Sequence, residues 1–188
     1  MVSQFIVGIT AIAWCFLHSF LITPSVEKLG VRFTGSWYRF LYVLTSCLTL
    51  GIAFLIIRQH QGEHLYSWLT SSRYLMVGVS ASITLLAISQ YDNQFFLGIS
   101  QIRTRKQKAD FSNTGILNYM RHPYYAAGII FVTFYDDFTT TSIVWRGIFV
   151  LYFLIGAKLE EKKLLDEHGQ TYADYMEKVP AFGKKWRR

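Results

Sequence analysis

The chain has 188 residues, of which 52% are hydrophobic, 17% aromatic and only 16% charged, against roughly 25% charged in soluble globular proteins. Such a composition excludes intrinsic disorder, collagen and coiled coil. The mean hydropathy is +0.24 although the formal net charge is +7 at pH 7. Apolar and basic residues must therefore lie in separate regions, which favours a membrane protein with basic flanks.

Five apolar segments, taken in chain order, predict an all-α integral membrane bundle, because a helix needs roughly 20 apolar residues to cross a bilayer core of about 30 Å. The segments are Phe5–Ile22, Phe40–Ile57, Tyr74–Ser89, Tyr124–Tyr135 and Ile143–Ala157. The first three contain no Lys, Arg, Asp or Glu. The last two are shorter, and Asp136 to Thr140 between them is predicted to be the turn of a helical hairpin.

The basic residues orient this bundle, because Lys and Arg concentrate on the cytoplasmic side of a membrane protein. With the N-terminus outside, 16 of the 19 Lys and Arg residues fall on the inner side, in 23–39, 90–123 and 158–188. We therefore predict an outer N-terminus and a cytoplasmic C-terminus. The basic C-terminal segment favours contact with anionic lipid head groups over nucleic-acid binding, since it follows a hydrophobic helix directly.

A secretory signal peptide is the alternative interpretation of the first apolar segment. Residues 1–4 carry no positive charge, and no small-residue cleavage site follows the segment. We expect the first helix to be retained in the membrane. The two cysteines, Cys15 and Cys47, lie in apolar segments and are expected to be buried, unreactive thiols.

The chain becomes amphipathic after the last apolar segment, from Leu159 onward. Apolar and aromatic residues recur there at spacings of three and four, which predicts one helical face with a break near Gly169. The residues of this face are Leu164, Leu165, His168, Tyr172, Tyr175, Met176 and Val179. We predict a cytoplasmic amphipathic helix that packs against the bilayer or the helix bundle.

An Arg-His-Pro segment precedes the fourth apolar segment. Pro123 suits the first turn of a helix, so Arg121 and His122 are predicted to lie at the positive end of the helix dipole. Such a position suits an anionic or polar ligand. The alternative is that the pair only anchors the helix at the membrane interface.

Other polar residues give weaker signals. His18 lies inside the first apolar segment, where it is either functional or hydrogen-bonded to a neighbouring helix. His60 and His64 are four residues apart, but no third ligand is evident nearby, so no metal site is predicted. Asp92, with Asn93 and Gln94, is expected to cap the third helix or to line a cavity.

Several nucleotide-binding and catalytic motifs are absent from the sequence. No two glycines stand two residues apart, which excludes the Rossmann fingerprint. The P-loop, the G-x-S-x-G elbow and the zinc-protease motif are also missing. Any cofactor must therefore be bound by a membrane architecture of another kind.

The segment from Tyr119 to Tyr125, followed by Glu160-Glu161 and then by Gly169, Tyr172, Tyr175 and Val179-Pro180, resembles the isoprenylcysteine carboxyl methyltransferase and phospholipid methyltransferase superfamily. The similarity covers roughly residues 112–182. His18-Ser19 and Tyr38-Arg39 are similar to its small bacterial branch, which includes methanethiol S-methyltransferases and a denitrification-associated membrane family.

The resemblance implies that S-adenosylmethionine binds at the cytoplasmic ends of the last two helices. It divides the single membrane domain, 1–188, into a three-helix part, 1–100, and a cofactor-binding part, 101–188. Arg121 and His122 are the candidate catalytic residues, by the chemistry of their side chains. The implied cofactor-binding residues are Leu117, His122, Pro123, Tyr124, Tyr125, Glu160 and Glu161, with a covering loop of Ala109, Asp110, Phe111 and Ser112.

Two positions depart from the family. Leu117 stands where the family often has Tyr. Gly156 stands where the prenylcysteine enzymes have an Arg that holds the substrate carboxylate, which makes a carboxylate acceptor less expected here.

The residues themselves agree with a cofactor of this kind. A Glu pair at the membrane interface needs a cation or hydrogen-bond donors, and the cofactor has an ammonium, ribose hydroxyls and a sulfonium. Arg121 would hold its carboxylate, and His122 could accept a proton from a thiol acceptor. The alternative is that Glu160 and Glu161 pair with Lys162, Lys163 or the basic third loop.

The leading hypothesis is an S-adenosylmethionine-dependent membrane methyltransferase, in a bacterial inner membrane, that acts on a lipophilic or small apolar acceptor such as a thiol or a lipid. One alternative is an NADPH-dependent, sterol-like membrane reductase. Another is a non-enzymatic membrane module of a respiratory system. The expected partners are the bilayer and the substrate, with no nucleic acid and no metal.

Overall fold

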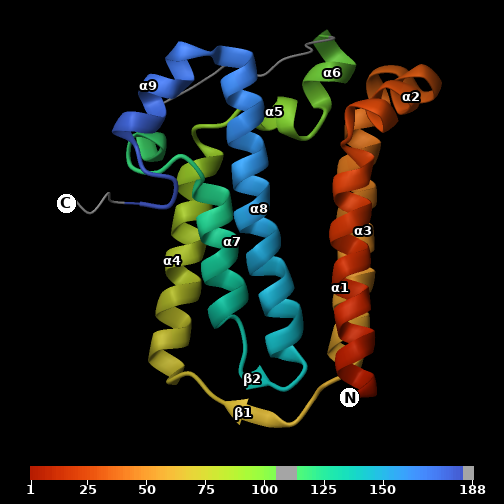
Figure 1. Cartoon of the computed structure of the whole chain (residues 1–188), viewed down its shortest axis with the longest axis vertical. Helices are drawn as coiled ribbons and strands as arrows, with labels where there is room; N and C mark the ends of the chain where they lie inside the picture. The colour runs from red at the N-terminus through yellow and green to blue at the C-terminus, as the bar shows by residue number, and fades with distance from the viewer. Residues whose placement is uncertain (105–113, 184–188) are drawn as a thin grey trace. The chain divides into compact units, whose positions relative to one another are not determined.

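The computed structural model describes residues 1–104 and 114–183, which are largely helical (Figure 1). Nine α-helices and two 3-10 turns occur in these ranges. In chain order the elements are α1 (Val2–Leu21), α2 (Pro24–Thr34), η1 (Gly35–Trp37), α3 (Tyr38–Gln59), β1 (His64–Tyr66), α4 (Thr70–Ile88), α5 (Asn93–Phe96), α6 (Ile99–Thr104), η2 (Gly115–Asn118), α7 (Pro123–Phe134), β2 (Phe138–Thr139), α8 (Ser142–His168) and α9 (Gln170–Lys178).

Four helical stretches in the described residues are long and apolar enough to cross a membrane. They are α1, α4, α8 and the stretch Pro24–Gln59, which contains α3. This agrees with the predicted all-α membrane bundle. α7 is also apolar but has only 12 residues, which gives a length of about 18 Å at 1.5 Å per residue. It is therefore shorter than a bilayer core.

The contacts divide the chain into two compact units that each draw on three stretches of sequence. The first unit contains Met1–Leu65, the described part of Asp92–Asp110, and Thr139–Ile148. The second contains Tyr66–Tyr91, the described part of Phe111–Phe138, and the described part of Phe149–Arg188. The candidate site residues that the structure describes all belong to the second unit.

α1 and α3 pack together in the first unit. The buried residues of α1 are Val7, Gly8, Ala11 and Cys15, and those of α3 are Tyr42, Ser46, Ala53 and Ile57. Small side chains let membrane helices approach closely. Cys47 is exposed, so the expectation that both thiols are buried is wrong for Cys47, which lies outside the buried stripe of α3.

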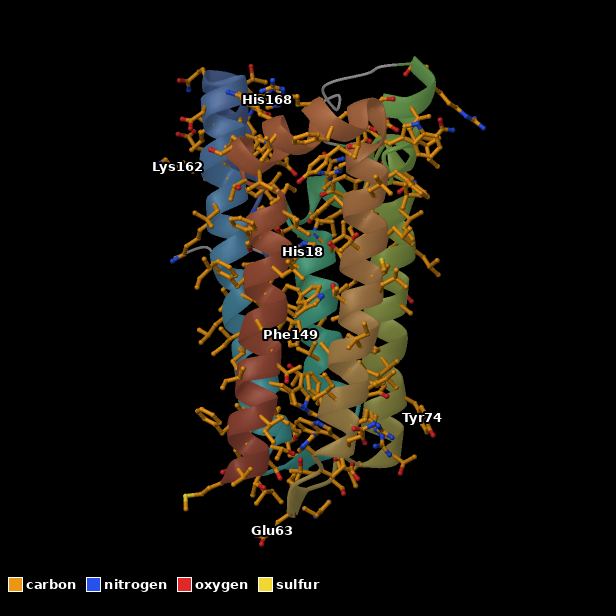
Figure 2. All side chains as sticks on the ribbon, turned by 90° about the vertical axis from the view of Figure 1, so that its right-hand side faces the viewer. His18, Glu63, Tyr74, Phe149, Lys162 and His168 are labelled. Atoms are coloured by element: carbon orange, nitrogen blue, oxygen red, sulfur yellow. The ribbon has the colours of Figure 1, made fainter. Side chains whose placement is uncertain are left out.

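His18 of α1 is hydrogen-bonded to α3 (Figure 2). Its Nδ1 lies 3.1 Å from the Ser46 hydroxyl, and its Nε2 lies 2.9 Å from the Tyr42 hydroxyl. The Trp14 ring stacks on the imidazole with ring centroids 5.0 Å apart. Of the two predictions for His18, the structure thus shows the hydrogen bond to a neighbouring helix.

α4, α7 and α8 form the framework of the second unit. The Ser80 hydroxyl of α4 donates to the Ala127 carbonyl of α7 at 2.9 Å. On another face of α7, a Cβ placed on Gly128 would lie 2.9 Å from the Phe153 ring of α8. The missing side chain of Gly128 therefore lets α7 and α8 approach closely.

The connecting segments carry more structure than the sequence predicted. The segment from Asp136 to Thr140 joins α7 to α8, as expected of a hairpin turn, and it also contains β2, which pairs with β1 in a two-stranded sheet. Asp92 caps a different helix from the one expected. Its carboxylate instead accepts a hydrogen bond from the Phe95 amide at 2.9 Å and caps the start of α5.

Candidate functional site

The candidate site is built around the start of α7. Pro123 occupies the first turn of this helix, as predicted, because its missing N–H and fixed φ suit that position. The preceding backbone is held by the C-terminal segment: the Arg121 amide donates to the Pro180 carbonyl and the His122 amide to the Ala181 carbonyl, each at 3.0 Å. Arg121 and His122 are therefore fixed at the entrance of α7.

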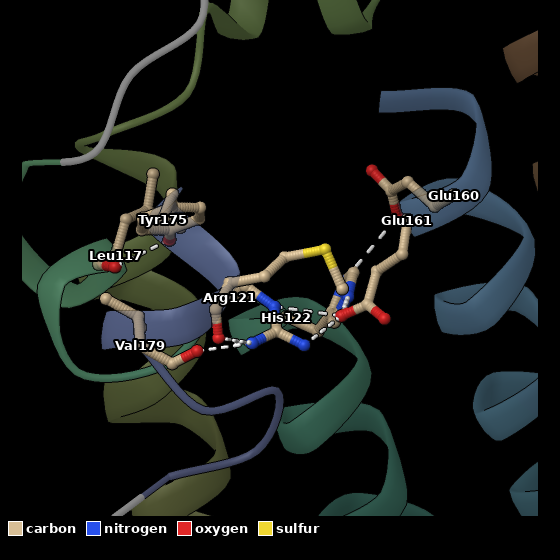
Figure 3. Close-up of polar contacts among 8 residues, drawn as sticks. Leu117, Arg121, His122, Glu160, Glu161, Tyr175 and Val179 are labelled. Carbon is tan, nitrogen blue, oxygen red and sulfur yellow. Dashed lines mark hydrogen bonds and ion pairs between the residues drawn. The ribbon is translucent and has the colours of Figure 1, made fainter. Parts of the chain in front are cut away.

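Arg121 joins α8 and α9 to this entrance (Figure 3). Its Nε donates to Glu161 at 2.8 Å, and a terminal nitrogen pairs with the same carboxylate. The other terminal nitrogen donates to the Met176 carbonyl at 3.1 Å and to the Val179 carbonyl. The Arg121 side chain is only 9% exposed, so these bonds compensate the cost of burying its charge.

His122 lies between the two glutamates and is 3% exposed. Its Nε2 is 3.0 Å from a Glu161 oxygen, and because a carboxylate only accepts, Nε2 must carry the proton of that bond. Its Nδ1 is 3.8 Å from a Glu160 oxygen, too far for a hydrogen bond. The second ring nitrogen of His122 therefore faces the Glu160 carboxylate without a hydrogen bond to it.

The two glutamates occupy different environments. The Glu161 side chain is 17% exposed and pairs with Arg121 and His122, whereas the Glu160 side chain is 43% exposed. Lys163 pairs with Glu167, at 3.9 Å. Glu161 therefore pairs with Arg121 and His122 and not, as in the alternative interpretation, with the neighbouring lysines.

Aromatic rings surround the imidazole of His122. The Tyr125 ring meets it edge-on at 5.5 Å, and the Phe182 ring lies at 5.9 Å. Tyr125 also lies against α8, since a Cβ on Gly156 would come 3.3 Å from its ring.

Tyr91 and Phe182 are site neighbours that the sequence interpretation missed. The Tyr91 ring lies 4.9 Å from that of Tyr124, and burial together with the Glu160 carboxylate raises the pKa of the Tyr91 phenol. Neither residue belongs to a recognisable motif. Only the packing of distant segments brings them to the site.

Leu117 is buried in η2, and its carbonyl accepts a hydrogen bond from the Tyr175 hydroxyl at 2.6 Å. Tyr175, Tyr172 and Val179 form an apolar cluster with Leu164 and Met176 packed against it. Burial raises the pKa of both tyrosines to about 12. The amphipathic face of α9 thus packs on protein, with Gly169 at φ +55° marking the predicted break.

The remaining predicted residues are placed as follows. Ala109, Asp110, Phe111 and Ser112 lie outside the described residues. His60 Nδ1 is 2.9 Å from the Ile56 carbonyl oxygen. Within 1–104 and 114–183, no three His, Cys, Asp or Glu residues are grouped as metal ligands would be.

Comparison with known proteins finds two bacterial relatives. A protein named methanethiol S-methyltransferase from Pseudomonas sp. (strain GM41(2012)) is 27% identical over 172 residues, which are 86% of this chain and 66% of the relative. A protein of the same name from Crocosphaera subtropica is 30% identical over 70 residues, which are 37% of this chain and 28% of the relative.

The chain is homologous to these methyltransferases. The relationship confirms the family resemblance that the Arg-His-Pro and Glu-Glu segments indicated. The chain spans less than two thirds of the length of both relatives. No family model matches the chain, and no solved structure matches it.

Proposed function

We propose that this chain is an integral membrane methyltransferase that uses S-adenosylmethionine and acts on a small thiol or another lipophilic acceptor. One observation carries the proposal. The chain is homologous to proteins named as methyltransferases, and its buried Arg121–His122–Glu161 cluster lies beside a second, more exposed carboxylate, Glu160, at the start of α7.

The donor set at this place fits the cofactor. Glu160 would bind its ammonium or ribose hydroxyls, because these are the groups that a half-exposed carboxylate attracts. The rings of Tyr124 and Tyr125 and of Phe182 offer apolar and aromatic surface for the adenine and the sulfonium. When bound, the cofactor supplies a methyl group already activated on a positive sulfur.

Arg121 receives a positioning role in this proposal. Each of its three guanidinium nitrogens already bonds to Glu161 or to the carbonyls of Met176 and Val179. The sequence suggested that it holds the carboxylate of the cofactor. Its bonds instead support a role in fixing Glu161, and through Glu161 the ring of His122.

His122 would hold or move the proton of the acceptor. In the neutral tautomer whose Nε2 donates to Glu161, Nδ1 would carry a lone pair beside Glu160. A thiol of pKa about 8.5 reacts as its thiolate, so a nearby proton acceptor raises the reactive fraction. The buried position of His122 and the surrounding rings would keep water from the acceptor.

Gly156 and Tyr125 support an acceptor without a carboxylate. The Tyr125 ring occupies the space next to Gly156 where a side chain would begin. Gly156 itself offers no cation to bind an anionic acceptor group. A small, neutral thiol is therefore favoured, which matches the name of the two relatives.

The cofactor and the acceptor are tested together on the full chain, purified in detergent or nanodiscs. Calorimetry should show S-adenosylmethionine binding that weakens at least tenfold in Glu160→Gln and His122→Ala, and labelled methyl groups should pass to methanethiol. Glu167→Gln, a change on the exposed surface of α8, is the matched control. Binding that ignores both site variants would contradict the proposal, as would protection by NADPH in place of S-adenosylmethionine.

We also propose that the site faces the cytoplasm of a bacterial inner membrane. The asymmetry of the basic residues supports this orientation, and both relatives are bacterial. A fluorescent reporter fused to the C-terminus should be active in cells. An active periplasmic reporter at that end would contradict this orientation.

A further inference from the structure

α2 is an amphipathic helix with no buried residue, placed between α1 and α3 in the first unit. Val26, Leu29 and Phe33 are spaced by three and four residues and so share one face. Leu29 is 55% exposed and Phe33 79% exposed. Lys28 and Arg32, four residues apart, occupy another face of the helix. The chain thus presents an apolar and a basic face side by side.

Tyr38 fixes the direction of α2. A Cβ on Gly30 would lie 1.9 Å from the Tyr38 ring, so α2 rests directly on that ring. The Tyr38 hydroxyl donates to the Leu21 carbonyl at the end of α1. Gly35, at φ +59°, then turns the chain into α3. Figure 1 shows α2 turned away from the common direction of α1 and α3, at the end where α1 stops and α3 begins.

The position of α2 identifies what covers its apolar face. α1 and α3 expose large apolar side chains along their membrane-crossing lengths, for example Phe16 and Leu48, and lipid surrounds such residues in a membrane protein. Trp37, the last residue of η1 just before α3, is 52% exposed, as is typical of the aromatic belt at a membrane surface. The apolar face of α2 therefore continues the lipid-covered surface of these two helices.

We propose that α2 lies in the plane of the membrane surface, with Leu29 and Phe33 inserted at the boundary of the acyl chains and Lys28 and Arg32 bound to anionic lipid head groups. Helices with this separation of apolar and basic faces bind at that depth. The surface carries two cations against the single acidic residue of the helix, Glu27. The inference is independent of the catalytic activity.

Spin labels on neighbouring positions test the depth of α2. Phe33→Cys and Arg32→Cys are labelled singly in a Cys47→Ala background, since Cys15 is buried, and the full chain is reconstituted in vesicles of phosphatidylcholine and phosphatidylglycerol. The label at 33 should collide more with oxygen, and the label at 32 more with a water-soluble nickel chelate. The proposal would be overturned if the two labels were equally exposed to the nickel chelate. It would also be overturned if neither label were accessible to oxygen or to the chelate.

A second measurement tests the choice of lipid. Lys28→Ala/Arg32→Ala should lower the enrichment of phosphatidylglycerol around the protein several-fold, because each basic residue near an anionic surface contributes a factor of roughly five. Phosphatidylcholine should be unaffected. Ser25→Ala, an exposed change on the same helix that leaves its charge intact, is the matched control. An equal loss in this control, or no loss in the Lys28→Ala/Arg32→Ala variant, would refute the role of Lys28 and Arg32.

Discussion

Arg121 shows how a single side chain supports the candidate site. It binds one carboxylate of α8 and two carbonyls at the end of α9, while its own backbone amide donates to Pro180. Such a residue does not need to touch the cofactor to affect its binding. Its removal would leave Glu161 buried without its main cation.

Arg121→Met should lower the free energy of unfolding by about 3 to 5 kcal/mol, as expected when one partner of a buried ion pair is removed. Arg121→Met/Glu161→Gln should cost clearly less than the two single changes added together, because no charge is then left unpaired. Unfolding of the four proteins in detergent by denaturant measures this. Additive losses would show that the pair is not coupled.

Tyr172 and Tyr175 predict a dependence of stability on alkaline pH. Burial raises the pKa of both phenols from 10.0 to about 12, so the folded state holds these protons more strongly than the unfolded chain. Their contribution is complete below pH 10 and is lost as the pH rises toward about 12.

The free energy of unfolding, measured between pH 9 and pH 12, should therefore fall, and the fall should be less steep in Tyr172→Phe/Tyr175→Phe. Tyr74→Phe is the control, since Tyr74 is 69% exposed. The loss of the Tyr175 hydroxyl also removes the hydrogen bond to the Leu117 carbonyl, a cost of about 1 kcal/mol at every pH. An unchanged pH profile in the double variant would contradict the assignment.

At the scale of the helices, close approach depends on where side chains are missing. A Cβ on Gly128 of α7 would lie 2.9 Å from the Phe153 ring of α8, whereas nothing lies within 4 Å of a Cβ on Gly147. The two glycines therefore have different roles although both are helical. Gly128 permits helix packing, and Gly147 does not.

Gly128→Ala should destabilise the chain by about 1 to 3 kcal/mol, because the added methyl group overpacks the contact between α7 and α8. Phe153→Leu should relieve part of this loss when the two changes are combined. Gly147→Ala should have little effect or stabilise slightly, because Ala is the better helix former. Thermal unfolding in nanodiscs distinguishes the variants, and equal effects of the two Ala substitutions would show that Gly128 is not a contact position.

For the whole molecule, local signals predicted the elements better than their contacts. Apolar runs located α1, α3 and α4, and Pro123 and Gly169 marked the beginning of α7 and the break before α9. These features depend on residues close in sequence. The helix up to the break at Gly169 was also predicted, but its continuity with the preceding apolar segment in α8 was not, because a change from apolar to charged residues does not end a helix.

The site was predictable only in part for the same reason. The motif residues His122 and Glu161 meet as expected, and their contact joins segments that both carry recognisable patterns. The carbonyls that bind Arg121 carry no side-chain signature, and neither does the approach of Tyr91 to Tyr124. Such contacts depend on the packing of the whole unit.

The hydrogen bonds from Arg121 and His122 to Pro180 and Ala181 also bear on how the chain matures. Synthesis proceeds from the N-terminus, so α7 is complete while the residues that hold its entrance are still inside the ribosome. The cluster around Arg121 can close only after residues 179–181 have emerged. Until then the start of α7 lacks these hydrogen bonds. Protection of this helix from hydrogen exchange should therefore be the last to develop.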